Sequence, residues 1–499
     1  MKFKENTPWK TSLGHHECKP KKLFYDITKA EELQQIIAEA ESNSLTARAV
    51  GSGHSFSKVA LCDDYLADIS GLNFFNVPAF STKYLPQWQN TKFIEAGGGI
   101  TIRNLNLKLT ENKLALINMG GIDHQTVAGA ISTGTHGTGI GLPAFPSMVL
   151  SFLLVSTAGK MYRMERTDGF HDKANYTPAY GETLVQDDDT FYSSLVSFGS
   201  FGIVHSVILE VKPLYYLREE TELTDWNKVR GMLLNKHIFL EQRSLNIRIN
   251  PYRINGKNNS CLLIRQYDDV TEQDYNNARP NQRRRRVLPE WFSKRSWSDD
   301  VLTWLFLLFP KRIPKQIEGS LKQLHDRTGF IGRSHEVLFL GQESLKEQGL
   351  DAEFAFSMKN DDYIFAVDDL LKETEKFRER NLFQTAQIGI RFVKGSKFTI
   401  ASDHGDGESF CFIDTPFWYA TRHKGEMLDF FQDFFISRGA KPHWGKVNNR
   451  VFDHPAELKG FYDWEKWLKL HDRYNNKGTF SSPFSREVVR VASSSLPLP

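Results

Sequence analysis

The sequence predicts an α+β protein with more than one structural unit, and three observations lead to this class. The chain has 499 residues, which is too long for one ordinary hydrophobic core. Two loops rich in glycine, serine and threonine, at 51–57 and 129–139, alternate with short apolar segments. After Pro213 this glycine-rich texture gives way to strands and amphipathic helices. We therefore expect a loop-rich N-terminal unit followed by a unit of mixed strands and helices.

Apolar segments bounded by turn residues define the elements of the N-terminal part. A capping box formed by Thr28 and Glu31 predicts a helix with an apolar face that includes Leu33 and Ile37. A second helix is expected at 101–112, and a helix with a turn at 193–201. Strands are expected at 22–27, 47–50, 65–69, 92–96, 149–156, 161–164 and 202–211.

The part after Pro213 has longer periodic segments. Strands are expected at 246–250, 260–265, 388–393 and 410–414, and helices at 365–380, 426–438 and 461–474. An apolar run at 301–309 has basic residues on both sides. It suits either a membrane interface or a buried helix, and we favour the buried helix because the run is far shorter than a bilayer-spanning segment.

Composition excludes several classes of protein. Hydrophobic residues make up 40% of the chain and charged residues 25%, which is typical of a soluble globular protein. The net charge of +3 is small for this length and predicts no nucleic-acid partner; the basic run at 283–286 is interpreted as a solvated loop. No stretch is long and apolar enough for a transmembrane helix, and the first residues lack a signal-peptide core. We expect a cytoplasmic protein, with peripheral membrane association through 301–315 as an alternative.

The cysteines and the N-terminal histidines give little sign of a metal site. Cys18, Cys62, Cys261 and Cys411 are scattered without metal-ligand spacing, so we expect free thiols in a reducing compartment. The segment 15–18 (His-His-Glu-Cys) has metal-binding residue types, but a flexible polar terminus is the favoured interpretation.

The segment 48–57 (RAVGSGHSFS) is the central motif of the chain. Its two glycines allow the backbone to approach a ligand closely, and successive N–H groups in such a turn form an anion-binding concavity. His54 would project toward that ligand. A polar turn that happens to contain a histidine is an equally good explanation of this motif taken alone.

A second glycine-rich stretch at 118–139 favours the ligand-binding interpretation. It contains Val127, Ala128, Ala130 and Ile131, which a disordered linker would not carry. We expect a short helical turn packed on the first loop. Neither loop matches G-x-G-x-x-G, and the chain has no P-loop and no G-x-S-x-G elbow. Two separate small-residue loops suit an elongated ligand with a central pyrophosphate, and a flavin dinucleotide fits this description better than a mononucleotide.

These two motifs, followed by 391–393 (RFV) and 442–446 (PHWGK), resemble the sugar-lactone and alditol oxidases of the vanillyl-alcohol-oxidase flavoprotein superfamily. The resemblance runs nearly end to end and in the same order. It implies a PCMH-type, two-subdomain FAD-binding unit at 1–213 that is completed by a C-terminal segment at 441–499. It also implies a cap domain at 214–440, with an antiparallel sheet and flanking helices.

The resemblance further implies that FAD is joined covalently to His54, for which a neutral imidazole is a suitable nucleophile. The alternative is that His54 only packs against the flavin ring. His136 is the weaker candidate for the bond and would pack within the pyrophosphate loop. The residues expected to bind the cofactor are Arg48, Gly51, Ser52, Gly53, His54, Ser55, Phe56, Ser57, Gly120, Ile122, Gly129, Ser132, Thr133, Gly134, His136, Gly137, Gly139, Gly202, Ile203 and Lys446.

The expected catalytic residues are Arg391, Lys446 and His443. Lys446 would hydrogen-bond the substrate oxygen, and Arg391 would balance negative charge on the reduced flavin. For both, a surface cation is the alternative, although Arg391 lies in an apolar strand and Lys446 follows an aromatic pair. His443 is an acid–base or positioning candidate together with Asp414, and packing explains these two equally well.

The chain departs from the family at Gly389, where the resemblance leads us to expect the glutamate of a Glu-x-Arg pair. Gln387 and Glu353 are two candidates to replace that carboxylate. The missing carboxylate puts sugar lactones and small polyols in doubt, because it would bind their hydroxyl groups, and the glycine would leave room for a bulkier or less polar substrate.

Three functions remain compatible with the sequence. The first is an FAD-dependent oxidase that acts on a CH–OH group of an aldonolactone-type or alditol-type substrate, with oxygen as acceptor. The second is a dehydrogenase that passes electrons to a quinone or cytochrome. The third is a flavin-binding protein without turnover.

Overall fold

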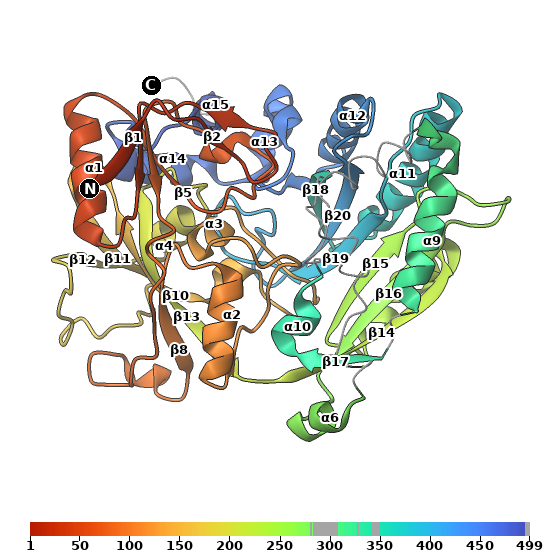
Figure 1. Cartoon of the computed structure of the whole chain (residues 1–499), viewed down its shortest axis with the longest axis horizontal. Coiled ribbons are helices and arrows are strands. Elements are labelled where there is room, and N and C mark those ends of the chain that lie inside the picture. Colours follow the sequence, from red (N-terminus) through yellow and green to blue (C-terminus); the bar gives the residue numbers. More distant parts are fainter. Residues whose placement is uncertain (280–281, 283–307, 327–328, 341–348, 495–499) are drawn as a thin grey trace.

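The computed structural model describes residues 1–279, 282, 308–326, 329–340 and 349–494. Its N-terminal elements and C-terminal helices lie on one side of the molecule, and a large sheet with its helices lies on the other (Figure 1). The chain passes from one sheet to another between β13 (Ile203–Pro213) and β14 (Tyr216–Asp225), next to the predicted domain boundary at 213. The exact domain limits at 213 and 440 stay a prediction.

A four-stranded sheet carries the first loop motif. Its order is β1-β4-β6-β5, and β4 and β5 both run parallel to β6. Helix α1 (Ala30–Ser42) buries Leu33, Ile36 and Ile37 in the core beneath it. The helix begins one residue later than predicted, because Glu32 rather than Glu31 accepts the N–H groups of residues 28 and 29. The strands are β1 (Lys2–Glu5), β4 (Lys22–Tyr25), β5 (Ala47–Val50) and β6 (Tyr65–Asp68).

A second sheet holds the other glycine-rich stretch in place. Its order is β12-β11-β10-β13-β8-β7, with β9 paired to β13. Every residue of β10 is buried, so this strand forms the centre of the N-terminal core. The other strands are β7 (Phe75–Asn76), β8 (Lys92–Gly97), β9 (Leu114–Ala115), β10 (Val149–Val155), β11 (Met161–Glu165) and β12 (Thr183–Gln186). The helices are α2 (Ile102–Glu111), α3 (Val127–Ser132) and α4 (Asp188–Leu195).

The third sheet has eight strands in the order β17-β14-β16-β15-β19-β20-β18-β21. Side chains alternate between its faces. Phe354 and Phe356 pack against Phe435 of α12, and Phe392 packs against Tyr363 of α11. The opposite face of these strands is turned toward the N-terminal unit, where the Gly139 N–H donates to the Phe392 carbonyl at 2.6 Å.

The strands of this sheet are β15 (Ser244–Ile249), β16 (Ser260–Tyr267), β17 (Phe330–Arg333), β18 (Gly349–Ser357), β19 (Ile388–Lys394), β20 (Ser409–Trp418) and β21 (Lys441–Pro442). Its helices are α5 (Trp226–Leu234), α6 (Glu272–Asn277), α9 (Ile313–His325), α10 (Ser334–Leu338), α11 (Asp362–Glu379) and α12 (Lys424–Ile436). Of the apolar run at 301–309, residues 301–307 lie outside the described chain, and Leu308 and Phe309 are exposed.

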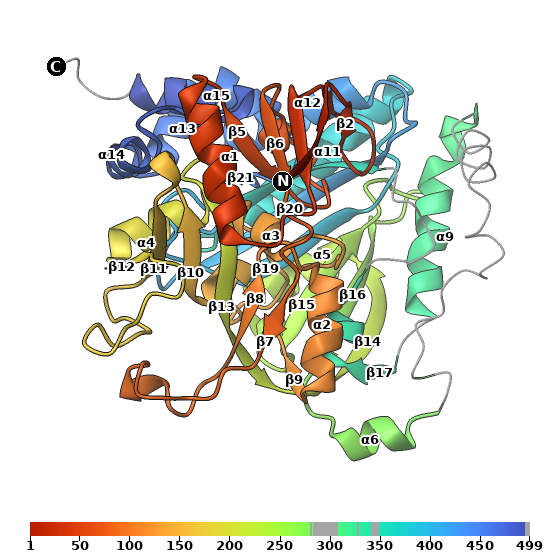
Figure 2. The same ribbon diagram turned by 60° about the vertical axis from the view of Figure 1, so that its left-hand side comes forward.

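The C-terminal segment returns to the N-terminal unit, as both ribbon views show (Figures 1 and 2). Its helices are α13 (Pro455–Phe461), α14 (Trp464–Asn475) and α15 (Pro483–Ser493). The Ala47 N–H donates to the Thr479 carbonyl at 2.7 Å, and the Phe56 N–H donates to the Gly445 carbonyl at 2.8 Å. The tail therefore fixes both ends of the first loop motif.

The prediction of a flexible polar terminus around residues 15–18 is wrong. They form a small hairpin of β2 (Trp9–Lys10) and β3 (Glu17–Cys18). Nε2 of His16 lies 2.8 Å from the Phe56 carbonyl oxygen, and the His15 ring packs on Phe56. The segment folds because it covers the first loop motif.

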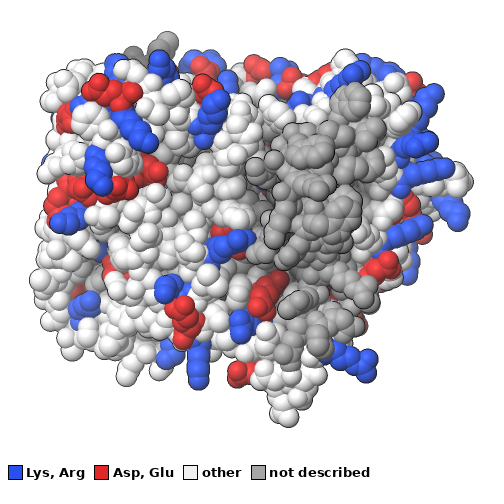
Figure 3. All heavy atoms as spheres, in the orientation of Figure 1, with Lys and Arg blue, Asp and Glu red and all other residues white. Residues whose placement is uncertain are grey.

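The predicted free thiols are confirmed, since all four cysteines are buried and unpaired with one another. Within the described residues, none of the helices combines the length and apolar character that crossing a bilayer requires. On the face shown in Figure 3, basic and acidic side chains are interspersed.

Candidate active site

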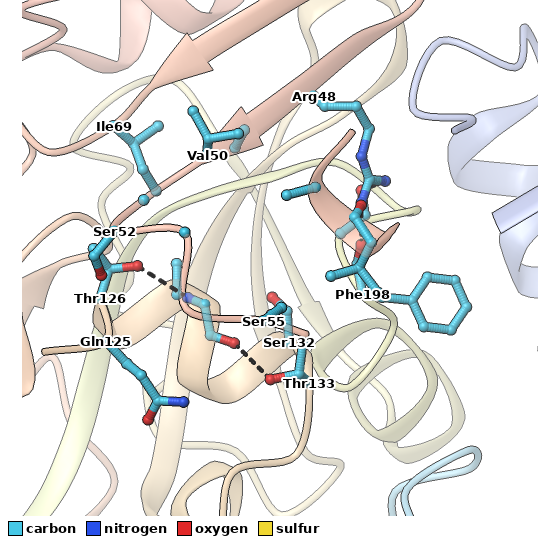
Figure 4. A pocket seen from close by; sticks show the side chains of 18 of the residues that line it. Arg48, Val50, Ser52, Ser55, Ile69, Gln125, Thr126, Ser132, Thr133 and Phe198 are labelled. Atoms are coloured by element: carbon cyan, nitrogen blue, oxygen red, sulfur yellow. Dashed lines mark hydrogen bonds between the residues drawn. The ribbon is translucent and has the colours of Figure 1, made fainter. Parts of the chain in front are cut away.

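The two predicted loops enclose a cavity of about 110 Å³ (Figure 4). They pack directly on each other: the Ser52 hydroxyl donates to the His124 carbonyl at 2.6 Å, and a Cβ at Gly51 would lie 2.2 Å from Oγ1 of Thr126. Gly51 is therefore required for this close approach. The predicted cofactor residues that line the cavity are Arg48, Gly51, Ser52, Gly53, His54, Ser55, Gly129, Ser132, Thr133, Gly202 and Ile203.

This first cavity presents backbone and small side chains rather than charges. Arg48 is its one charged lining residue, and the guanidinium donates to the carbonyls of Val59, Phe198, Gly199 and Phe480. Arg48 therefore joins β5, the 198–199 turn and the C-terminal tail, instead of reaching into the cavity as a free cation. A narrow lining of glycine, serine and threonine suits a dinucleotide held by main-chain groups.

Four of the predicted cofactor residues lie outside the lining of this cavity and of the second one described below. They are Ser57, Gly134, Gly137 and Gly139. The Ser57 hydroxyl donates to the Trp444 carbonyl at 2.6 Å, and a Cβ at Gly137 would lie 2.4 Å from the Met119 carbonyl oxygen. These residues shape the loops and their contacts with neighbouring segments.

A second cavity of about 390 Å³ adjoins the first. His54, Ser55 and Gln125 line both, so His54 lies at the junction. Nδ1 of His54 is 3.2 Å from the Ser12 hydroxyl, and its ring stacks on His124. Burial, assisted by His124, lowers the pKa of His54 to about 4, so the imidazole is neutral at physiological pH.

The second cavity contains the remaining predicted residues Phe56, Gly120, Ile122, His136, Arg391, His443 and Lys446. His136 was predicted to pack within the pyrophosphate loop. It lies instead over Phe412 of β20, with ring centroids 3.7 Å apart, and its Nε2 is 3.4 Å from Glu353. Gly139, three residues later, donates its N–H to the Phe392 carbonyl of β19 and so holds this part of the loop against the eight-stranded sheet.

Strand register places charged side chains in one row across the sheet. Glu353 of β18 lies opposite Asp414 of β20, and Asp414 lies opposite Gly389 of β19. Gly389 in turn lies opposite Arg248 of β15. Because residues paired in this way share a face, the side chains of this row point into the same cavity.

Two ion pairs dominate the charges of the second cavity. Arg391 donates to Glu353, and Nζ of Lys446 lies 2.7 Å from Asp351. Although burial disfavours the Glu353 anion, Arg391, His136 and Lys446 together hold its pKa well below the usual range. Burial opposes the charged forms of Arg391 and Lys446 as well, but the nearby carboxylates raise the pKa of both.

Asp351 behaves differently from Glu353. Burial raises the pKa of its carboxyl group to about 7, against the effect of Lys446, and the neighbouring Asp414 and Glu353 act in the same direction as burial. Asp351 therefore exchanges a proton near neutral pH, which is the range of a useful general base.

His443 is held as a neutral donor. Its Nδ1 accepts the Gly445 N–H at 3.0 Å, which places the ring proton on Nε2. Burial lowers the pKa of His443 to about 3. His136, Glu353 and His443 also bring ligand atoms within 4.8 Å of one another, but Arg391 and Lys446 beside Glu353 make this an unfavourable cation site.

The room predicted above Gly389 is filled, so that prediction is wrong. A Cβ at this position would lie 2.2 Å from Oδ1 of Asp414 and 2.5 Å from Nη1 of Arg248. Of the two predicted replacements for the missing glutamate, Gln387 donates to Ser320 of α9, whereas Glu353 accepts a hydrogen bond from Arg391.

Three further residues of the site were missed by the sequence analysis: Ser12, Arg248 and Asp351. A signal for Asp351 existed, because two carboxylates alternate with apolar residues in the segment 349–357. Arg248 lies in a predicted strand, but its importance depends on the register with β19. Ser12 gave no signal.

Comparisons with known proteins agree with this arrangement. A family model described as "FAD binding domain" matches residues 22–165, and one described as "D-arabinono-1,4-lactone oxidase" matches residues 207–488. L-gulono-1,4-lactone dehydrogenase of Mycobacterium tuberculosis strain H37Rv is 23% identical over 487 residues, which cover 96% of this chain and 99% of the relative. D-arabinono-1,4-lactone oxidase of Candida albicans is 29% identical over 265 residues, which cover 51% and 42%.

Among solved structures, a cholesterol oxidase from B. sterolicum has a TM-score of 0.74 at 12% identity and covers 98% of this chain and 97% of that one. This likeness concerns the fold, and it confirms the predicted α+β class. The predicted flavoprotein family and the FAD cofactor are confirmed by the two family models.

Proposed function

Because this chain belongs to the D-arabinono-1,4-lactone oxidase family and is an FAD-linked oxidoreductase, we propose that it oxidises a CH–OH group of a neutral aldonolactone, with oxygen as electron acceptor. The balanced charge of the second cavity is the observation that carries the substrate class. Three carboxylates (Asp351, Glu353, Asp414) and three cations (Arg248, Arg391, Lys446) line it. Such a site offers many hydrogen bonds to hydroxyl groups without net attraction for an anion.

The first cavity supports FAD binding through its backbone-rich lining, and His54 is the proposed point of covalent attachment to the flavin. Its neutral imidazole at the junction of the cavities supports this assignment. When bound, FAD supplies the hydride acceptor. The residues of the second cavity then bind the substrate and accept the proton of its reacting hydroxyl group.

We assign the removal of the proton from the reacting hydroxyl group to the Lys446–Asp351 pair. Lys446 is a cation at neutral pH and donates a hydrogen bond to the substrate oxygen, which favours the alkoxide form. Asp351, 2.7 Å from the lysine and with a pKa of about 7, accepts the proton. His443 contributes a hydrogen bond from Nε2 rather than acting as the base, since its Nδ1 is occupied.

Arg391 is the proposed electrostatic partner of the reduced cofactor. Glu353 fixes its guanidinium from one side, and Asp414 lies 3.5 Å away. Both carboxylates orient the arginine, and Arg248, 3.6 Å from Asp414, balances the charge of the second carboxylate.

Anaerobic mixing with L-gulono-1,4-lactone or D-arabinono-1,4-lactone tests the proposal. We expect bleaching of the flavin band near 450 nm, and release of one hydrogen peroxide per lactone oxidised under air. A flavin that stays oxidised with these lactones and with alditols contradicts the substrate assignment.

A dehydrogenase is the second candidate, favoured by the relative that aligns over nearly the whole chain, which is named a dehydrogenase. Bleaching without peroxide, together with reduction of a quinone or cytochrome c, would identify it. A flavin carrier without turnover would show no bleaching at all. Peripheral membrane association through 301–315 stays a prediction, as does a cytoplasmic location.

A further inference from the structure

We propose that Asp414, placed above Gly389 between Arg248 and Arg391, is the carboxylate that accepts hydrogen bonds from the hydroxyl groups of the substrate. The inference rests on the proposed function and names a binding group within that same site. It also explains how the chain works with a glycine where the family resemblance leads one to expect glutamate.

Asp414 occupies the space that a side chain at position 389 would need. Oδ1 and Oδ2 of Asp414 lie 2.2 and 2.6 Å from the place of a Cβ at Gly389. The two residues are direct cross-strand partners, so their side chains belong to the same face. The carboxylate has in effect moved from β19 to the adjacent position on β20, and the glycine leaves it room.

The carboxylate of Asp414 is oriented but not saturated. Arg248 Nη1 lies 3.6 Å from Oδ1, and Arg391 Nη2 lies 3.5 Å from Oδ2. Both separations suit an ion pair but exceed ordinary hydrogen bonds. Oδ1 is buried and has no hydrogen-bond partner among the described residues, although the side chain lines the cavity. A buried carboxylate oxygen without a donor is costly. Because the side chain lines the cavity, a rotation of the carboxylate would bring this oxygen to a substrate hydroxyl.

Glu353 is less suited to this task, although it lies in the same row. Its Oε1 accepts a hydrogen bond from Arg391 and lies 3.4 Å from His136. Its Oε2, like Oδ1 of Asp414, is buried without a hydrogen-bond partner among the described residues, but Lys446 lies 4.0 Å from it. Its side chain is only 1% exposed. We therefore assign Glu353 to orienting Arg391, and Asp414 to binding the substrate.

Arg248 extends the same recognition surface. Its side chain is 21% exposed, it lines the cavity, and Asp414 balances its charge. A carboxylate next to a guanidinium offers acceptors and donors side by side. This pattern fits adjacent hydroxyl groups of a polyhydroxylated lactone better than an apolar substrate.

Asp414→Asn tests the inference in the flavin-loaded enzyme. We expect KM for the lactone to rise about 10- to 100-fold, as for the loss of a charged hydrogen bond, with a smaller change in kcat. The exposed Asp406→Asn is the matched control and should leave KM unchanged. Dissociation constants of monodeoxy lactones for the anaerobically pre-reduced enzyme, which cannot oxidise them, are measured by calorimetry and provide a readout that does not depend on turnover.

The monodeoxy series identifies the contact. The wild type should lose affinity for the analogue that lacks the hydroxyl bound by Asp414, and Asp414→Asn should show no further loss for that analogue. Equal losses for every analogue in both enzymes would overturn the inference, and so would an unchanged KM in the variant.

A swap of the two positions tests the geometry and guards against a variant that fails to fold. Gly389→Glu alone should clash with Asp414 and weaken lactone binding, whereas Gly389→Glu combined with Asp414→Ala should bind more tightly than Asp414→Ala alone. A double variant no better than Asp414→Ala counts against the assignment. If the wild type does not react with any lactone, the proposed function fails; if it does and Asp414→Asn binds normally, only this inference fails.

Discussion

The two cavities that meet at His54 are built in opposite ways. The first is formed mainly by two loops that are each continuous in sequence, together with the segment 198–204, and it offers backbone and small hydroxyl groups. The second is formed by separate loop segments and by side chains from several strands, and six of its lining residues are ionisable acids or bases other than histidine. In the first, a residue matters because it is small; in the second, it matters because of its charge and its partner. The two cavities should therefore respond differently to substitution.

Removing one charge from the second cavity should give the largest effect. Arg391→Met leaves Glu353 buried without its main cation, and breaking a buried pair in this way costs about 3–5 kcal/mol. We expect a lower free energy of unfolding, measured by urea titration of the FAD-loaded enzyme.

The double variant Arg391→Met with Glu353→Gln is the control for this prediction. It should recover much of the lost stability, because the uncompensated carboxylate is gone, but it should not recover activity. If Arg391→Met alone were as stable as the wild type, the charges of the second cavity would not be coupled as the distances indicate.

Adding one methyl group to the first cavity should give the next largest effect. Gly51→Ala places a Cβ against Thr126, and overpacking of this kind costs about 1–3 kcal/mol. Because the two loops must separate, we expect FAD affinity to fall about 10-fold or more, measured as flavin content after dialysis.

Gly141→Ala is the matched control, since a Cβ there meets nothing within 4 Å. It should bind FAD like the wild type. Full flavin content in Gly51→Ala would show that the first cavity tolerates a larger side chain at this position. It would weaken the contrast between a cavity that depends on small residues and one that depends on charge.

The same contrast explains what could be predicted from the sequence. Most residues that line the first cavity could be named from the sequence, because they are contiguous and glycine indicates backbone conformation and close approach directly. Arg391, His443 and Lys446 were also predicted and lie together in the second cavity. Its remaining groups depend on register: Asp414 and Arg248 become neighbours of Gly389 only through two strand pairings. A one-residue slip would turn them to the other face. The apolar alternation of each strand indicates its buried face, but it does not show which strands pair with one another.

The N-terminal hairpin was missed for a different reason. Its short strands, β2 and β3, have no periodic apolar pattern. Their order comes from contact with the first loop: the Ser12 N–H donates to the Gly53 carbonyl at 2.9 Å, and His16 contacts the Phe56 carbonyl. Long-range contacts of this kind override local preferences, so the segment resembles a polar tail in the sequence alone.

Asp351 allows a test of the second cavity by itself, because this carboxyl group lines the second cavity and not the first. Its pKa is about 7 in the folded protein and about 4 in an unfolded chain. The stability from this group is therefore complete below about pH 4 and is lost as pH rises through 7. Activity should rise over the same range, since the proposed proton acceptor must be ionised.

Asp351→Asn should flatten both dependences. We expect the profile of kcat/KM to lose its step near pH 7, and the melting temperature to fall less between pH 5 and 8 than in the wild type. A variant that keeps the wild-type step would assign the titration to another group.

The smallest expected effect concerns Ser12, whose hydroxyl contacts His54 at the junction of the two cavities. If the hydroxyl orients the imidazole for attachment to the flavin, Ser12→Ala should slow attachment only a few-fold, as for the loss of one partly exposed hydrogen bond. The readout is the fraction of flavin that stays in the acid-precipitated pellet at early times after FAD is added. His54→Ala should release all flavin, and Ser42→Ala, at an exposed hydroxyl on α1, should behave like the wild type. Equal rates for the wild type and Ser12→Ala would mean that the hairpin covers the loop without orienting its histidine.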